Sequence, residues 1–248
     1  MNEAPELTPE ERAIYEWQMW LPGFGEMAQR KLKGASVLIS RVGGIGGLVA
    51  AQLAMAGIGK LVLAMGGEVQ ARDLNRQLLQ SHDRLGKPRL DSILSRLRDL
   101  NPRVELIGVS ENISDANARE LAAQADVLVD AAPLFEERFA LNRAAVALGK
   151  PMVECAMFAL EARLTTFIPG RTGCLTCLHR EAPPDWRREF PVLGAVSGTV
   201  ACMAAVEVVK LLTGLGAPLA DTLLTMDLGS MQFRRLRIGQ SPGCPVCG

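Results

Sequence analysis

The stretch from Ser36 to Ala64 constrains the fold more than any other part of the chain. Residues 36–40 are a short apolar run rich in branched side chains, which is typical of a buried parallel strand. A glycine-rich turn at 41–47 follows, then helix-forming residues 48–56 and a second apolar run, 61–63. Glycine permits the sharp turn, and a helix beginning there directs free N–H groups towards a phosphate. This pattern predicts the start of a mononucleotide-binding fold.

This unit differs in two places from the G-x-G-x-x-G pattern of dinucleotide-binding loops. Arg41 occupies the position of the first glycine. The acid that would bind the ribose hydroxyls is missing, because residues 64–67 read Ala-Met-Gly-Gly and the first carboxylate is Glu68. The residues alone leave two interpretations open, a nucleotide site or a tight strand-to-helix turn without a ligand.

Strands and helices alternate along residues 36–155, which predicts a doubly wound, mostly parallel α/β sheet, Rossmann-like in its first half. The expected strands are 36–40, 61–63, 104–109, 127–130 and 151–155, and the expected helices are 48–56, 87–100, 114–123 (capped by Ser114) and 136–148. Ligands of such sheets bind beyond the carboxyl ends of the strands. That rule points to segments 41–47, 64–77 and 130–135.

A different pattern follows Cys155 and predicts an antiparallel C-terminal extension. It contains an expected strand at 162–168, an exposed crossing loop at 181–191, a long apolar helix at 194–212 that we expect to be buried, and a hairpin of 222–227 with 231–236. We divide the chain into an N-terminal helical arm (1–34), a nucleotide-binding half (35–160) and a C-terminal half (161–248). Together they are expected to form one structural domain.

The N-terminal arm begins with a helix-start signal, Thr8 as the cap and Pro9 in the first turn. The aromatic residues Tyr15, Trp17 and Trp20 follow. Such an arm packs either on a neighbouring subunit or over the core of its own domain, and the sequence favours neither.

The overall composition excludes several classes of partner. Of the 248 residues 48% are apolar, enough for a sizeable core, and the 27 basic residues balance the 27 acidic ones. We therefore expect neither nucleic acid nor a membrane as a partner. The acidic, proline-bearing start does not resemble a signal peptide, so the expected location is cytoplasmic. In that reducing compartment, the six cysteines are thiols or metal ligands in preference to disulfides.

Two C-x-x-C pairs, Cys174 with Cys177 and Cys244 with Cys247, predict a structural zinc site. Each turn presents two thiolates, and the two turns together complete a tetrahedron. Four sulfur ligands leave no position for a water molecule, which argues against metal catalysis. The alternatives are redox thiols or two unrelated turns. Such a metal would tie the end of the chain to its middle as a zinc knot.

The remaining cysteines and the two histidines carry weaker signals. Cys155 ends a strand near the expected binding edge and is a possible nucleophile, although the sequence places no His or acid in a position to activate it. Cys202 lies on the apolar helix, where we expect it in the core. His82 and His179 lie in polar segments and are expected at the surface.

The order of these features resembles the ThiF/MoeB/HesA family, the bacterial relatives of ubiquitin-activating enzymes. The resemblance runs from about Tyr15 to Cys247 and rests on the glycine loop, Arg76-Gln77, residues 86–89 (Gly-Lys-Pro-Arg), Val129-Asp130 and the C-x-x-C pairs. It is closest to the MoeB-type activator of molybdopterin synthase. It implies a homodimer with structural zinc on the four paired cysteines. It also implies binding of ATP with Mg²⁺ and adenylation of the glycine-rich C-terminus of a ubiquitin-fold sulfur carrier.

The resemblance also implies roles for individual residues. The expected phosphate loop contains Gly43, Gly44 and Gly46, preceded by Arg41. The expected catalytic cations are Arg76, which would meet the phosphates, and Arg89, where the family usually has a lysine. Asp73 and Asp130 complete the expected cofactor-binding set.

At several positions this chain lacks the residue that is typical of the family, and these differences lead to a second hypothesis. Ala64 and Gly66 stand where the family has the two acids that grip ribose, and Pro133 stands at the acid next to the metal. Trp17 lies where a partner-donated arginine is expected, and the crossing loop has no cysteine. The chain is therefore either an adenylyltransferase or a pseudoenzyme, a dimeric zinc-bound binding or assembly partner without ATP chemistry. A nicotinamide oxidoreductase fits less well.

Overall fold

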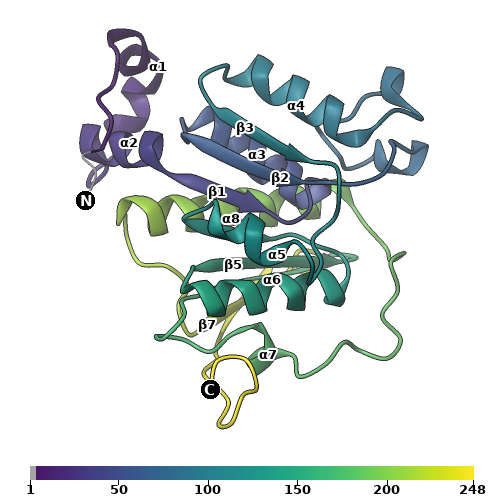
Figure 1. Cartoon of the computed structure of the whole chain (residues 1–248). Coiled ribbons are helices and arrows are strands. Elements are labelled where there is room, and N and C mark those ends of the chain that lie inside the picture. The colour runs from purple at the N-terminus through teal and green to yellow at the C-terminus, as the bar shows by residue number, and fades with distance from the viewer. Residues whose placement is uncertain (1–3) are drawn as a thin grey trace.

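One eight-stranded sheet, in the order β3-β2-β1-β4-β5-β6-β7-β8, runs through the computed structural model, which describes residues 4–248 (Figure 1). Its strands are β1 (Ser36–Ile39), β2 (Lys60–Ala64), β3 (Glu105–Val109), β4 (Val127–Asp130), β5 (Met152–Phe158), β6 (Glu161–Phe167), β7 (Thr222–Asp227) and β8 (Gln232–Arg237). Strands β1 to β5 pair in parallel, and β5 to β8 pair antiparallel. The predicted parallel sheet with an antiparallel extension is confirmed.

Helices cover both faces of the sheet and enclose two apolar clusters. The helices are α1 (Pro9–Met19), α2 (Gly25–Gly34), α3 (Gly44–Met55), α4 (Arg89–Leu100), α5 (Ala118–Ala123), α6 (Phe135–Leu148), α7 (Leu175–Leu178) and α8 (Gly194–Thr213), with short 3-10 turns η1 (Ala71–Asp73) and η2 (His82–Arg84). Helices α2, α3, α4 and α8 contribute to the cluster on one face, and α5 and α6 to the cluster on the other.

The strand order places the expected binding edge at a topological switch point. Strand β1 lies between β2 and β4, so the connections after β1 and β4 leave the sheet side by side in opposite directions. The glycine turn 41–47 therefore neighbours segment 130–135. Strand β5 pairs in parallel with β4 through Glu154 and Asp130, and antiparallel with β6, so it borders both halves of the sheet.

The turn between β1 and α3 is tighter than the sequence suggested. Helix α3 begins at Gly44 instead of at Leu48, so the loop glycines form its first turn. A Cβ at Gly46 would lie 1.9 Å from the carbonyl oxygen of Arg41. Glycine is thus required at this position for the close approach of helix and strand, whatever the loop binds.

Helix α8 corrects two expectations. It packs on α3, β5 and β6, but only that side is buried, whereas Cys202 and Val206 on the other side are exposed. Cys202 is therefore not a core residue. The helix is long and apolar enough to span a membrane by length and composition alone, and packing in the core accounts for the apolar residues on its buried side.

The N-terminal arm, described from residue 4, starts as predicted. Thr8 accepts a hydrogen bond from the backbone N–H of Glu11 at 3.1 Å, and the Glu11 carboxylate accepts one from the N–H of Thr8 at 2.7 Å. This capping box fixes the first turn of α1. Trp17 and Trp20 are exposed and stack at 6.2 Å between ring centroids.

The predicted helix at 114–123 is shorter than expected. Helix α5 begins at Ala118, because the Asn117 side chain accepts a hydrogen bond from the backbone N–H of Ser114 and holds residues 114–117 in a turn.

Candidate functional site

A cavity of about 670 Å³ opens at the carboxyl edge of the parallel strands. It lies between the glycine turn, segment 70–77 and the crossing segment, which we define as residues 180–193. We call this cavity the arginine pocket, because six arginines and only two acids line it: Arg41, Arg72, Arg76, Arg89, Arg138, Arg188, Asp73 and Glu189. The pocket therefore combines the expected phosphate loop with an excess of positive charge.

Arg41, at the position of the missing glycine, is not free to meet a ligand. Its Nε and Nη2 donate hydrogen bonds of 2.7 Å to the two carboxylate oxygens of Glu137, in the first turn of α6. Both residues are buried. The bidentate pair offsets the charge of Arg41 and ties the glycine turn to α6.

Asp73 and Arg89 form a second buried ion pair. Arg89 donates to Oδ2 of Asp73 from Nε at 3.1 Å and from Nη2 at 2.7 Å. Asp73 also accepts hydrogen bonds from the Gln77 side chain and from the backbone N–H of Gln70. Asp73 is 1% exposed, so its oxygens are already engaged within the protein.

Arg76 and Arg188 supply the least compensated charge in the pocket. Arg76 is half-buried and lies 3.8 Å from Asp73, which is already paired with Arg89. Its neighbour Arg188 projects from the crossing segment. Arg188 is exposed, but desolvation by the surrounding residues and the nearby guanidinium groups of Arg41, Arg76 and Arg89 lower its pKa. A potential that disfavours a cation favours an anion, so the pocket suits a phosphate or a carboxylate.

Asp130, at the end of β4, belongs to a buried network. Arg138 of α6 donates from Nε to Oδ2 of Asp130 at 2.8 Å and from Nη2 to Glu154 of β5. Arg163 of β6 lies 3.1 Å from the same Glu154 oxygen. Burial, together with the neighbouring Glu154, raises the pKa of Asp130. Our sequence reasoning missed Arg138 and Glu154, since α6 and β5 contain no motif that marks them.

A second cavity, of about 470 Å³, lies against β5 to β8 beneath the crossing segment, and we call it the sheet groove. It meets the arginine pocket at residues that line both cavities: Arg138, Ala156, Met157 and Trp186. The two cavities are therefore adjacent, one against the antiparallel half of the sheet and the other at the expected phosphate loop.

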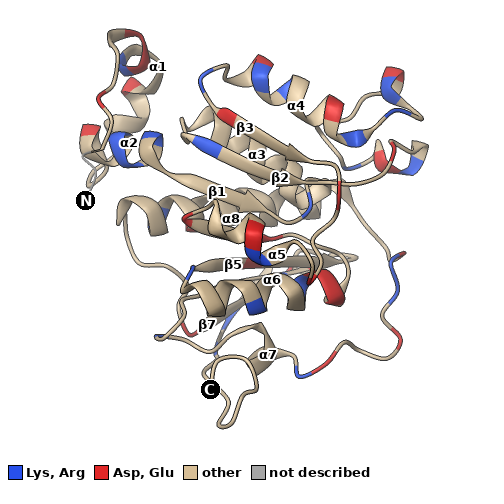
Figure 2. Cartoon of the chain, viewed as in Figure 1, with Lys and Arg blue, Asp and Glu red and all other residues tan. Residues whose placement is uncertain are grey.

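Trp186 holds the crossing segment over this junction. Its indole N–H donates a hydrogen bond of 2.7 Å to the carbonyl oxygen of Pro133, and its ring packs against Phe135, Phe158 and Phe190. Figure 1 shows the segment as the green coil at the right edge of the view, and Figure 2 shows acidic and basic residues along it. The sequence predicted an exposed loop here and gave no sign of the Trp186 anchor.

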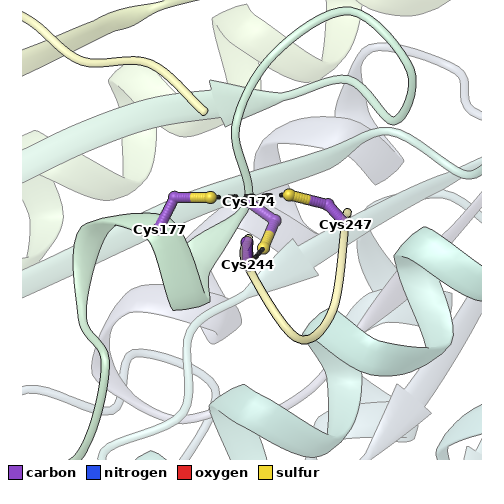
Figure 3. A group of neighbouring side chains, drawn as sticks. All are labelled: Cys174, Cys177, Cys244 and Cys247. Carbon is purple, nitrogen blue, oxygen red and sulfur yellow. Dashed lines mark hydrogen bonds between the residues drawn. The ribbon is translucent and has the colours of Figure 1, made fainter. Parts of the chain in front are cut away.

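The four paired cysteines converge on one point between α7 and the C-terminal tail (Figure 3). Their sulfur atoms all lie within 4.8 Å of one another, with 3.8 Å between Cys174 and Cys244 and 3.4 Å between Cys177 and Cys247. Four ligands at the usual Zn–S distance would place the sulfurs about 3.8 Å apart. The cluster fits a tetrahedral metal ion, and two unrelated turns are excluded.

The cluster already favours one thiolate. Burial opposes ionisation of Cys244, but hydrogen bonds from the backbone N–H groups of Cys247 and Val246 lower the pKa of Cys244 to about 7. The backbone N–H of Ser241 lies 3.3 Å from the sulfur of Cys177. These contacts favour negative charge on Cys244 and Cys177, whereas burial raises the pKa of Cys174 and Cys247 in the metal-free cluster.

The surroundings of Cys155 and His179 do not favour chemical reactivity. Cys155 is 1% exposed, and burial raises the pKa of its thiol well above the usual range, which disfavours a nucleophilic thiolate. His179 is half-buried with its ring 5.4 Å from Phe135, and burial lowers its pKa to about 4. The expected surface position is correct for His82 and wrong for His179.

A family model described as the ThiF family matches residues 15–246. The chain belongs to the ThiF family. Protein HesA of Leptolyngbya boryana is 51% identical to this ThiF-family chain over 98% of the chain and 88% of that protein. The sulfur carrier protein adenylyltransferase of Thermus thermophilus is 35% identical over 97% of the chain and 92% of that protein.

Solved structures give the same assignment of the fold. The crystal structure of E. coli MccB with MccA-N7isoASN superposes with a TM-score of 0.85 at 26% identity, covering 95% of this ThiF-family chain and 75% of that chain. The structure of E. coli MccB with ATP has a TM-score of 0.79 at 26% identity and covers 90% and 69%. The predicted family is thus confirmed.

Proposed function

We propose that this ThiF-family protein binds the C-terminal tail of a ubiquitin-fold sulfur-carrier protein of cofactor biosynthesis. The adjacency of the sheet groove and the arginine pocket, which share four lining residues, carries the proposal. An extended tail lying in the groove would pass beneath Trp186 and bring its terminal carboxylate to the arginines. Two relatives support a peptide substrate: one is a sulfur carrier protein adenylyltransferase, and MccB has been solved with MccA.

Adenylation of that carboxylate is the activity we propose for the site. A carboxylate oxygen would bond to the α-phosphorus of ATP while the bond from that phosphorus to the pyrophosphate oxygen breaks. The step brings anions together, so nearby cations must offset the charge. Arg76 and Arg188 are placed to do so, and the free N–H groups at the start of α3 face the same pocket.

A second candidate is tail binding without nucleotide chemistry, the function of a pseudoenzyme. Positions 64, 66 and 133, where the family resemblance implies acids, have no carboxylate in this chain. Mg²⁺ is usually held through carboxylate oxygens, so their absence favours this candidate. The internal pairing of Arg41 and Arg89 with Glu137 and Asp73 favours it as well.

ATP–pyrophosphate exchange separates the two candidates. The assay uses each ubiquitin-fold carrier encoded in the same genome, intact and with its last two residues removed. Adenylation predicts exchange above background that needs the intact tail and falls by about 10²-fold or more in Arg76→Ala, but not in the exposed control Arg98→Ala. Carrier binding without exchange and without calorimetric ATP binding supports the second candidate. Carrier binding that ignores the tail contradicts both.

We propose zinc as the metal of the cysteine cluster, since four sulfur ligands in this geometry suit a structural zinc ion. Reduced thiols require a reducing compartment, so a cytoplasmic location is part of this proposal. Elemental analysis should find about one zinc per chain. A different metal, or none, would refute it.

We also propose a homodimer. Trp17 and Trp20 are 78% and 66% exposed, which is unusual for large aromatic side chains and is consistent with an arm that packs on a second copy. Light scattering should give twice the chain mass. The double variant Trp17→Ser/Trp20→Ser should shift it towards the monomer, whereas a monomeric wild type would contradict the proposal.

A further inference from the structure

Arg138 is the only charged side chain among the residues that line both cavities. It extends from α6 to the junction between the sheet groove and the arginine pocket, with only 3% of its side chain exposed. A chain that runs from one cavity to the other along these shared residues would pass its guanidinium.

Two sides of this guanidinium are held by the protein. Nε donates to Asp130 at 2.8 Å, and Nη2 donates to Glu154 and, at 3.4 Å, to the carbonyl oxygen of Cys155. Among residues 4–248, Nη1 donates no hydrogen bond. Because the guanidinium is planar, fixing Nε and Nη2 also fixes the direction of the N–H groups on Nη1. The result is a rigid, unused donor at the junction.

The charge around this donor selects a neutral acceptor. The buried acids Asp130 and Glu154 together offset the charges of Arg138 and Arg163, so the network as a whole is neutral. The arginine pocket beyond it has six arginines against two acids. A carboxylate is therefore attracted past the junction into the pocket, whereas a peptide carbonyl fits at the junction itself.

We propose that Nη1 of Arg138 donates a hydrogen bond to one backbone carbonyl oxygen of the bound tail, at the point where the tail enters the arginine pocket. This inference rests on the proposed tail binding and adds a specificity-determining residue to it. The contact recognises the backbone of the tail and not a side chain. It therefore fixes the position along the groove at which the tail's carboxylate reaches Arg76 and Arg188.

The test is a thioamide scan of the bound peptide. The probe is a fluorescent ten-residue synthetic peptide ending in Gly-Gly with a free carboxylate, and each of its last four backbone carbonyl oxygens in turn is replaced by sulfur, a weaker acceptor. At one position the replacement should weaken binding to the wild type by about three- to tenfold, the range expected for losing part of a hydrogen bond from a charged donor.

Arg138→Lys supplies the matched comparison. Lysine keeps the charge near Asp130 and Glu154 but has no planar fork to reach the tail. The variant should bind the unmodified peptide more weakly and lose the sensitivity at that one position. Arg143→Lys is the control, one turn later on α6, where Arg143 pairs with Asp115 at the surface. It should behave as the wild type.

Each outcome bears on a different claim. Equal sensitivity in the wild type and Arg138→Lys would overturn the role of Arg138 and leave tail binding intact. A wild type that binds the peptide with no sensitive position overturns it too, without any variant, so the test survives if Arg138→Lys does not fold. A wild type that binds no peptide overturns the proposed function together with this inference.

Discussion

The cysteine cluster and the arginine pocket lie at opposite ends of β5, and they differ in how much of their chemistry the residue types reveal. In the cluster, every ligand is a cysteine of a C-x-x-C pair and all four sulfurs converge. In the pocket, the cations are present, but Arg41 and Arg89 are paired with buried acids that lie elsewhere in the sequence. The identity and position of the ligands are enough to define a metal site. The binding properties of a charged pocket depend also on which of its charged groups are already paired within the protein.

The largest expected effect in this comparison is loss of the metal. Cys244→Ser removes one of the four proposed ligands and should release the zinc ion that we propose for the cluster. Because structural zinc contributes up to about 10–16 kcal/mol of binding energy to folding, the melting temperature should fall by about 10 °C or more. Scanning calorimetry with elemental analysis measures both. The exposed Cys202→Ser should match the wild type, and an equal fall in both variants would argue against a metal cluster.

Breaking the pocket's buried pair should have the next largest effect. Glu137→Ala leaves the Arg41 guanidinium buried without a counter-charge and should lower the free energy of unfolding by about 3–5 kcal/mol, measured by urea denaturation. The neighbouring Glu136 is exposed, so Glu136→Ala should cost less than about 1 kcal/mol. Similar losses in the two variants would mean that the pair does not organise the glycine turn.

A smaller effect should follow from restoring one acid to the pocket. Pro133→Asp would supply a carboxylate at the position where the family has one, and Mg²⁺ bound to ATP would gain a ligand. We expect ATP affinity in the presence of Mg²⁺ to rise about tenfold by calorimetry, which corresponds to about 1.4 kcal/mol. Pro133→Asn is the uncharged control. No gain over that control would mean that the missing acid at position 133 does not limit ATP affinity.

The smallest effect tests a region remote from both sites, the N-terminal arm. Burial opposes the charged form of Glu11, but hydrogen bonds from Lys33 and Thr8 outweigh it and lower its pKa below the ordinary value of 4.5. As the pH falls, the Glu11 carboxylate therefore takes up a proton in the unfolded chain before it does so in the folded chain. The stabilisation is present above pH 4.5 and is lost as the pH falls below that value. Glu11→Gln should cost about 1 kcal/mol at pH 7 in urea titrations.

Measurements at low pH complete that experiment. The difference in stability between the wild type and Glu11→Gln should shrink as the pH falls below 4.5, while the exposed Glu16→Gln should follow the wild type throughout. A constant difference at every pH would mean that the capping hydrogen bonds, and not the charge, carry the effect.

Most of the fold could be predicted because its signals are local. The apolar run before the glycine turn, the alternation of strands with helices, and the cysteine spacing each lie within a few residues. The capping signal of Thr8 is equally local, and the structure confirms it. Helix α8 was harder, because a nearly uniform apolar sequence does not say which side faces the sheet, and Cys202 was assigned to the wrong one.

The contents of the site were harder still to predict because they depend on distant partners. Arg41 and Glu137 are 96 residues apart, and neither is unusual in its own segment. The hydrogen bond from Trp186 to Pro133 joins a polar loop to a turn 53 residues earlier. His179 is enclosed by Phe135, which only the tertiary structure brings near. The spacing of cysteines in a sequence can identify the ligands of one metal ion. It does not show which acidic side chain will pair with which basic one.

The position of Cys177, three residues before the crossing segment begins, has a consequence for the cell. That segment is fastened at one end by the cysteine cluster and at the other by α8, and between them it arches over the sheet groove. If the cluster holds the zinc ion that we propose, loss of that ion would release the first of these two attachments. Under the proposed function, binding of a carrier tail beneath the crossing segment would then depend on the zinc supply of the cell.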